Sequence, residues 1–341
     1  MRKTLAVGWF HNGDFQGVCG AHLPRIREVF FAWPDVLSCR PAPDYTPELR
    51  ERQQADLAWA RAHGLELDTL FNCNCYGDQA ISPELADFVS STLRKMDAVG
   101  LFPDTVTTTS PFIATILRQR FPSVKIRLSV NQRVHGSVGF EPILPLFDSF
   151  YATRERHRET EWLKRMSGWA RAHGKTIGIQ ANSGCLRQCP YQTFHDNLHG
   201  HNRRAQSKVG EAFDFSAFIC REHFACGGHE DFLRGTWLRP EDLPRYEPLV
   251  DVVKLATRRH PFPEKIVAAY ANYAFDGDLA ELMDARHVFP NIFDNACFAD
   301  SLWDEVRECP DANDCRHCGR CASLLAKVFH AKKNDFIFKR P

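Results

Sequence analysis

Short β-like runs alternate with helical stretches along most of this chain, and this alternation constrains its fold more than any other feature. The runs are rich in β-branched and aromatic residues, which is typical of buried strands. They are Thr4–Trp9, Glu28–Trp33, Leu67–Phe71, Thr105–Thr108, Lys125–Val130, Ser149–Ala152, Thr176–Gln180, Gly235–Leu238 and Asp251–Leu255. Repeated alternation predicts a parallel sheet with helices outside, and about eight units favour an α/β TIM-like (β/α)8 barrel. An open doubly wound sheet is the alternative, but the chain has no G-x-G-x-x-G to support it.

Helix starts between the runs are marked by a hydroxyl residue followed by proline, at Thr46-Pro47, Ser82-Pro83 and Ser110-Pro111. One helix end is repeated, because Trp59–Gly64 recurs 110 residues later as Trp169–Gly174. The two copies precede strands four units apart, which is half a barrel. The echo therefore predicts that Cys75 and Cys185 lie at the same end of the barrel, although six residues can also match by chance.

The alternation fades after about Leu255, which divides the chain in two. We expect residues 1–260 to form the barrel and residues 261–341 to form a helical, Cys-rich extension folded back on it. Within the extension, Pro261–Met283 has a helical pattern, and Pro290–Cys321 is rich in Asp, Asn and Cys.

Composition excludes several classes of protein. The net charge of +1 gives no sign of binding to nucleic acid through bulk charge. No apolar run approaches the ~20 residues of a membrane helix, and the apolar part of Thr4–Phe10 is shorter than most signal sequences. The 13 cysteines are an odd number, which favours a reducing, cytoplasmic setting and thiolate or metal chemistry over a disulfide framework.

The strongest local motif is Cys315-Arg-His-Cys318-Gly-Arg-Cys321, with Cys309 shortly before it. Two-residue spacers let three thiolates converge on one iron–sulfur cluster, most simply of the 4Fe-4S type. Cys309, Cys297 or a barrel cysteine would supply the fourth ligand. Zinc is the alternative occupant, since four-cysteine zinc sites use similar spacings, and a set of buried thiols without metal is a further alternative.

A second cysteine pair follows a predicted strand end, at Cys185 and Cys189. The spacing resembles the start of a radical S-adenosylmethionine motif, but Gln192 stands where the third cysteine belongs, so that class is excluded. Cys220 and Cys226 are downstream candidates to complete a four-thiolate set. His195 follows on the same segment, and it is either catalytic or a structural histidine at a helix start.

Polar side chains follow several other predicted strands, where the active face of a barrel would lie. They are Asn72, Asn74, Ser110, Asn131, Arg133, Arg154, Arg239 and Arg258. Each alone could belong to a solvated loop. Together the arginines would suit a small anionic substrate, such as a carboxylate or a phosphate.

The chain resembles the peptidase U32 family, also called collagenase-like peptidases, over roughly residues 4–260. The segments that carry the resemblance are Asn182–His201 with its Cys189-Pro190-Tyr191, Trp237–Leu243, Tyr246, Asp251–Arg258, Phe71–Gly77 and Thr109–Pro111. The resemblance implies a TIM-like barrel. It also implies either a peptidase or an iron–sulfur protein of the kind that acts in oxygen-independent hydroxylation.

We therefore expect an iron–sulfur oxidoreductase, most specifically an oxygen-independent hydroxylase of a small molecule or an RNA. His195, Asn182 and Asn131 would be catalytic. Asn72, Arg133, Arg239 and Arg258 would bind substrate. The metal ligands would come from Cys185, Cys189, Cys309, Cys315, Cys318 and Cys321. The alternatives are a peptidase, for which no nucleophile–base pair is evident, and a non-catalytic iron–sulfur subunit that acts with a protein partner.

Overall fold

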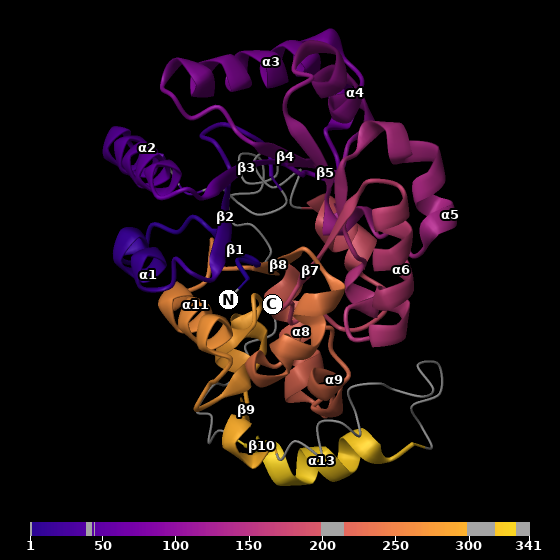
Figure 1. Cartoon of the computed structure of the whole chain (residues 1–341). Helices are drawn as coiled ribbons and strands as arrows, with labels where there is room; N and C mark the ends of the chain where they lie inside the picture. The colour runs from indigo at the N-terminus through magenta and orange to yellow at the C-terminus, as the bar shows by residue number, and fades with distance from the viewer. Residues whose placement is uncertain (1, 39–42, 44, 199–214, 299–317, 332–341) are drawn as a thin grey trace.

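A computed structural model describes residues 2–38, 43, 45–198, 215–298 and 318–331, with the side chains of 215–218 left out. Eight parallel strands close into a barrel at the centre of the molecule (Figure 1). They are β1 (Leu5–Gly8), β2 (Ile26–Phe31), β3 (Glu66–Phe71), β4 (Thr105–Thr108), β5 (Lys125–Leu128), β6 (Ser149–Tyr151), β7 (Thr176–Gln180) and β8 (Val252–Leu255). Each strand pairs with its neighbour in sequence, and β8 closes on β1. The predicted TIM-like barrel is confirmed.

Helices surround the strands. They are α1 (Phe15–Ala21), α2 (Pro47–Ala62), α3 (Pro83–Ala98), α4 (Pro111–Arg120), α5 (Ser137–Phe140), α6 (Thr160–Ala172), α8 (Phe215–Ala225), α9 (Glu230–Leu233), α10 (Leu243–Tyr246), α11 (Pro263–Asn272) and α13 (Arg320–Val328). The predicted N-caps are present, because the hydroxyls of Thr46, Ser82 and Ser110 each accept from an amide in the first turn. Single 3-10 turns connect the larger elements: η1 (Gly77–Gln79), η2 (Val130–Gln132), η3 (Glu141–Leu146), η4 (Arg154–Arg156), η5 (Pro240–Asp242), η6 (Glu247–Leu249), η7 (Leu279–Leu282), η8 (Arg286–Val288) and η9 (Asn295–Cys297).

The repeated sequence occupies equivalent places in the barrel. Its two copies end α2 and α6, immediately before β3 and β7, and each closes on a glycine with positive φ, Gly64 at 72° and Gly174 at 64°. Cys75 and Cys185 follow the carboxyl ends of β3 and β7. Because all the barrel strands are parallel, the two cysteines lie at the same end, as predicted.

One predicted strand is wrong. Gly235–Leu238 is an irregular segment after α9, although Thr236, Trp237 and Leu238 are buried. The Leu238 amide donates to the Ala181 carbonyl at 2.7 Å, and the Trp237 indole donates to the Phe232 carbonyl at 2.7 Å. These bonds satisfy the polar groups without strand pairing, so burial alone produced the strand-like pattern.

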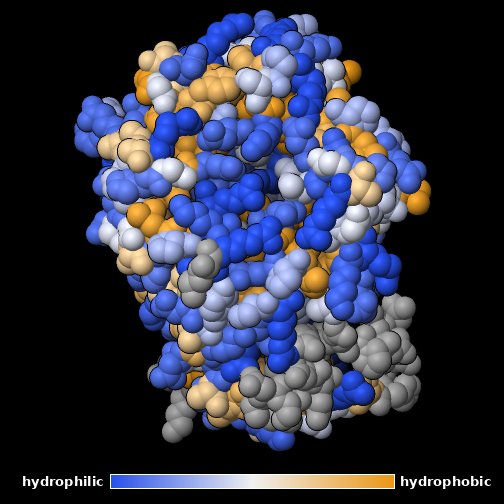
Figure 2. Space-filling view, in the orientation of Figure 1, coloured by the Kyte–Doolittle hydropathy of each residue, from blue (hydrophilic) through white to orange (hydrophobic). Residues whose placement is uncertain are grey.

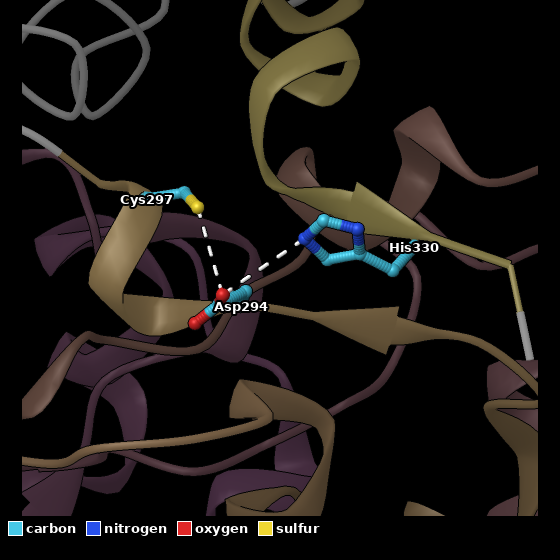
Figure 3. A group of neighbouring side chains, drawn as sticks. All are labelled: Asp294, Cys297 and His330. Carbon is cyan, nitrogen blue, oxygen red and sulfur yellow. Dashed lines mark hydrogen bonds and ion pairs between the residues drawn. The ribbon is translucent and has the colours of Figure 1, made fainter.

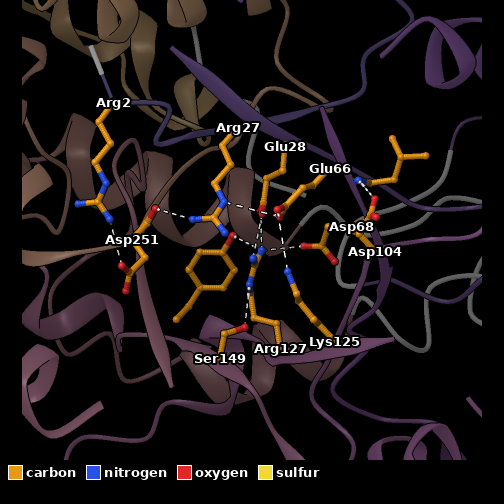
Figure 4. A network of polar contacts seen from close by, with 12 residues as sticks. Arg2, Arg27, Glu28, Glu66, Asp68, Asp104, Lys125, Arg127, Ser149 and Asp251 are labelled. Atoms are coloured by element: carbon orange, nitrogen blue, oxygen red, sulfur yellow. Dashed lines mark hydrogen bonds and ion pairs between the residues drawn. The ribbon is translucent and has the colours of Figure 1, made fainter. Parts of the chain in front are cut away.

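The barrel interior holds charges as well as apolar side chains (Figure 4). Arg127 on β5 forms a two-pronged ion pair with Glu28 on β2, in which Nη2 lies 2.9 Å from Oε2. Its Nη1 also lies 3.1 Å from Asp68 Oδ2 on β3, and Asp68 accepts from the Thr107 hydroxyl at 2.7 Å. Burial, together with the charge of Glu28, raises the pKa of Asp68 to about 7. Burial opposes the charge of Glu28, but Arg127 holds the pKa of Glu28 below its ordinary value.

The chain after the barrel packs against the same hydrophobic core. Tyr270, Leu279, Phe293 and Leu324 belong to the core cluster that includes the barrel strands. The predicted helix over Pro261–Met283 is wrong in its second half, because α11 ends before Tyr273, which has a left-handed backbone. A two-stranded antiparallel sheet of β9 (Ile292–Phe293) and β10 (Phe329–His330) follows, beside α13. The division at residue 260 stays a prediction.

The surface facing the viewer in Figure 2 is largely hydrophilic, with apolar side chains scattered between charged ones. Within the described part of the chain, no helix combines the length and apolar character that crossing a membrane requires.

Candidate active site at the barrel mouth

A cavity opens at the carboxyl end of the barrel strands and encloses about 660 Å³ of empty space, part of it open to solvent. Its walls are Phe30, Leu70, Asn72, Val130, Asn131, Arg154, Gln180, Asp196, Lys254, Ala256, Arg258, Arg259, His260 and Asp284. Most of these residues end a strand or follow one directly, which is where barrel enzymes place their chemistry. The cavity is therefore the candidate active site.

Lys254 supplies a nearly buried positive charge on the wall of this cavity. Its ammonium nitrogen lies 4.2 Å from the ring centre of Phe30 and 5.2 Å from that of Tyr151. Aromatic faces stabilise a cation that burial has partly stripped of water. The charged layer of Glu28, Asp68 and Arg127 lies near it in the barrel interior, because the charge of Lys254 acts on both carboxyl groups and lowers their pKa values.

Arg154 holds three loops of the mouth together. Its Nη2 donates to Asn131 Oδ1 at 2.8 Å and lies 3.4 Å from Asp196 Oδ2. Its Nη1 lies 3.6 Å from Cys185 Sγ. Burial opposes the guanidinium charge, but Cys185 and Asp196 raise the pKa of Arg154 above its ordinary value. The group therefore stays charged, and it fixes the segments after β5, β6 and β7 relative to one another.

Asp284 reaches the cavity from the chain that follows the barrel. Its Oδ1 accepts from the Gly184 amide at 2.9 Å, and its Oδ2 accepts from Gln180 Nε2 at 3.2 Å. The Asp284 amide in turn donates to the Asn182 carbonyl at 2.9 Å. A carboxylate fixed by several donors keeps its orientation when a ligand binds.

His260 lines the cavity as a neutral imidazole. Burial lowers its pKa to about 4. Its Nδ1 accepts from the Phe262 amide at 3.0 Å, which a protonated Nδ1 could not do. The ring therefore adds polarity to the wall without adding charge at neutral pH.

Three residues predicted to serve the site line the cavity together with Arg154, namely Asn72, Asn131 and Arg258. Arg133 does not, because it is held by Glu155 at 2.7 Å and donates to Thr193 Oγ1 at 3.3 Å. Arg239 is buried against the extension, 2.8 Å from Asn295 Oδ1. The structure thus separates the predicted arginines into different environments.

Asn182 is fully buried and bonded to backbone. Its Oδ1 accepts from the Ala256 amide at 2.7 Å, and its Nδ2 donates to the Leu282 carbonyl at 2.9 Å. His195 is partly buried in a helical turn over 192–198, and its neighbour Asp196 lines the cavity. The catalytic roles of Asn182, Asn131 and His195 stay predictions.

The predicted metal ligands are described only in part. Cys185 and Cys189 are partly buried on the loop after β7, and burial raises the pKa of the Cys189 thiol. Cys318 is exposed and Cys321 is partly buried at the start of α13. Cys309 and Cys315 lie outside the described residues, as do His199 and His201. Convergence of the tail cysteines therefore stays a prediction.

Two cavity residues carried signals that the sequence analysis did not use. Lys254 occupies an inward position of a predicted strand, where a charged residue is unusual unless it has a role. Asp196 follows His195 directly. Because neighbouring side chains point apart on a helix, Asp196 can face the cavity when His195 does not. Asp284 carried no such signal, because a hydrogen bond between residues 100 positions apart places it.

No family profile matches the chain. The uncharacterized protease MJ1657 of Methanocaldococcus jannaschii is 20% identical over 340 residues, covering 94% of this chain and 98% of that protein. The solved structure of the U32 peptidase Mk0906 superposes with a TM-score of 0.53 at 16% identity, covering 74% of this chain and 92% of the other. The predicted resemblance to the U32 peptidases is confirmed. This U32-like chain shares the barrel fold with that structure.

Proposed function

We propose that this U32-like chain is an enzyme that binds the carboxylate of its substrate in the barrel-mouth cavity. The observation that carries the proposal is the excess of positive charge there. Four cationic side chains, Arg154, Lys254, Arg258 and Arg259, share the lining with two carboxylates, Asp196 and Asp284. Because a partly enclosed site weakens solvent screening, this excess attracts an anion more strongly than the same charges would on an open surface.

The remaining groups would orient the substrate. The amides of Asn72, Asn131 and Gln180 offer donors and acceptors around the cavity. Phe30 and Leu70 offer an apolar wall. This combination suits a small organic acid or the carboxyl end of a short peptide.

Peptide hydrolysis is one reaction type for this site, and the names of the two relatives favour it. Hydrolysis needs a group that accepts a proton from the attacking water. Asp284 and Asp196 are the carboxylates in the cavity. We assign the base to Asp284, because the Gly184 amide and Gln180 fix its carboxylate at the cavity wall.

Iron–sulfur chemistry is the second reaction type, favoured by the thiol at the mouth and the C-x2-C-x2-C tail. Cys185 fits a metal ligand in its donor chemistry, because the Arg154 guanidinium beside its sulfur would offset the charge of a bound thiolate. Three of Cys189, Cys309, Cys315, Cys318 and Cys321 would complete a four-thiolate ligand set. A cluster there would supply electron transfer or Lewis-acid chemistry, including oxygen-independent hydroxylation. With this reaction type we also propose that the protein acts in the cytoplasm together with a protein partner.

Carboxylate recognition is tested with short peptides that differ only at the C-terminus. We expect the peptide with a free C-terminal carboxylate to have a kcat/KM at least about tenfold above that of the peptide with a C-terminal amide. If neither is turned over, the Kd values should differ by the same factor. Lys254→Met should remove this preference, whereas Lys95→Met, on the outer surface of α3, should keep it. Equal treatment of acid and amide by the wild type would refute the proposal.

The two reaction types are separated by purification without oxygen followed by iron and sulfide analysis. Iron and sulfide that fall in Cys185→Ala but not in Cys19→Ala would support the cluster. Cleavage of peptides by iron-free protein would support hydrolysis. Because Cys19 is a buried core thiol on α1, retention of the fold in both variants is checked first by circular dichroism.

A further inference from the structure

The small sheet of β9 and β10 carries three potential metal ligands. Phe329 pairs with Phe293, and His330 pairs with Ile292, in an antiparallel ladder. The Asp294 amide, just after β9, donates to the Val328 carbonyl at 2.8 Å and continues this ladder. Asp294 and His330 are therefore diagonal neighbours on one face of the ribbon, where their side chains can meet.

Cys297 joins them from the following turn. Asp294 is the N-cap of η9, and Cys297 is the last residue of that 3-10 helix. In a 3-10 helix, side chains three positions apart lie above one another, so Cys297 returns to the side of Asp294. Figure 3 shows the thiol and the imidazole converging on the carboxylate from two different elements.

The distances are close to those of a mononuclear zinc site. Asp294 Oδ2 lies 3.5 Å from Cys297 Sγ and 3.9 Å from His330 Nε2. One ligand atom from each of the three residues lies within 4.8 Å of the others. Tetrahedral zinc with ordinary bond lengths places neighbouring ligand atoms about 3.3–3.6 Å apart. The carboxylate and the thiol already have this spacing, and the exposed imidazole closes the site by moving toward both of them.

The scaffold beneath these ligands is closely packed. The opposite face of the ribbon packs through Phe293, which stacks on Phe232 at 3.8 Å, and through Phe329, which stacks on His229 at 4.6 Å. The second carboxylate oxygen of Asp294 accepts from the Ala296 amide at 3.0 Å, which fixes the carboxylate plane. Ligands held by a packed scaffold lose little freedom when a metal binds.

We propose that Asp294, Cys297 and His330 form a zinc site with three protein ligands and one position for water. Thiolate, imidazole and carboxylate are the ligand types that zinc uses, whereas Mg²⁺ and Ca²⁺ favour sites made only of oxygen. The ion replaces the proton that the Cys297 thiol shares with Asp294, and that proton passes to solvent. Bound zinc ties β10, and with it α13, to the turn after β9 that contains Asp294 and Cys297.

The test uses metal-free, reduced full-length protein titrated with Co²⁺ and then with Zn²⁺. We expect one equivalent of Co²⁺ to give a near-ultraviolet thiolate charge-transfer band that one equivalent of Zn²⁺ abolishes. Cys297→Ala should lose the band, and Asp294→Asn or His330→Ala should weaken Co²⁺ binding by more than about tenfold. His135→Ala, which changes an exposed histidine elsewhere, should bind as the wild type does.

The same titration distinguishes Co²⁺ bound at the proposed site from Co²⁺ bound by the tail cysteines. A band that persists in Cys297→Ala but disappears in Cys318→Ala would overturn the proposal, and so would the absence of any band in the wild type. The melting temperature is a second measurement, and it identifies variants that are misfolded. Zn²⁺ should raise the melting temperature of the wild type and of His135→Ala, but not that of His330→Ala, because only a folded site gains stability from its ligand.

Discussion

Asp284 accepts a hydrogen bond from the Gly184 amide at 2.9 Å, across 100 residues of sequence. This bond fastens the chain after the barrel to the loop after β7. It places a carboxylate in the cavity that none of the eight barrel strands supplies. The barrel mouth is therefore completed by the extension, and damage to this connection should affect both stability and ligand binding.

Asn182→Ala should weaken that connection. The change leaves the Leu282 carbonyl and the Ala256 amide without the partners that Asn182 gives them. Losing buried hydrogen bonds of this kind costs about 1–3 kcal/mol, which chemical denaturation measures. Carboxylate binding should also fall, because Asp284 follows Leu282 closely. Asn272→Ala, at the exposed end of α11, is the control, and similar losses in both variants would contradict the prediction.

Arg127→Met should destabilise the barrel strongly. It leaves Glu28 buried without its ion-pair partner, and Asp68 loses a donor as well. Breaking a buried pair costs about 3–5 kcal/mol, because the remaining charge cannot reach water. Lys164→Met removes an exposed helix pair with Glu161 and should change the free energy of unfolding by less than about 1 kcal/mol. Equal effects of the two changes would show that the interior network is solvated.

Asp68→Asn should change how stability depends on pH. The pKa of Asp68 is about 7 in the folded protein and about 3.9 in an unfolded chain, so the folded state binds the extra proton between these values. The free energy of unfolding therefore falls as the pH rises from about 4 to about 7. Asparagine cannot titrate, and its oxygen can still accept from Thr107 and Arg127. Relative to the wild type, the variant should gain stability over this range.

Urea titrations at several pH values measure that difference. Asp87→Asn, an exposed carboxylate on α3, should leave the pH dependence as it is in the wild type. Parallel curves for Asp68→Asn and the wild type would contradict the prediction.

Arg154→Lys should impair the site although it keeps the charge. A single ammonium cannot contact Asn131, Asp196 and Cys185 as the planar guanidinium does. We expect kcat/KM to fall by about tenfold or more in protein that circular dichroism shows to be folded. Arg156→Lys, whose partner is the partly exposed Glu159, provides the control in the same assay. Wild-type activity of Arg154→Lys would remove Arg154 from the site.

Much of this architecture could be predicted from sequence because it depends on local patterns. Proline after a hydroxyl marked helix starts, and β-branched runs marked the eight strands. The strand predicted over Gly235–Leu238 was wrong because a buried irregular segment contains the same kind of apolar run as a strand. Asn72, Asn131 and Arg258 line the cavity, as their positions after strand ends in a parallel barrel predict. The contribution of Asp284 could not be found, because contacts distant in sequence place it.

The separation of Arg133 and Arg239 from the cavity has the same origin. Glu155 lies four residues past the end of β6, and Asn295 lies in the extension. Each of them binds an arginine that its position after a predicted strand had placed at the barrel mouth. Side-chain partners of this kind are visible only when the chain is folded.

The most direct test of the carboxylate-binding cavity is a crystal structure of the protein soaked with a small dicarboxylate such as malonate. The account predicts one carboxylate within hydrogen-bonding distance of Lys254 Nζ and of a guanidinium nitrogen from Arg154 or Arg258. The same soak of Lys254→Met crystals should leave that position to water. Malonate bound only to arginines on the outer surface of the wild type, with water filling the cavity, would contradict the account.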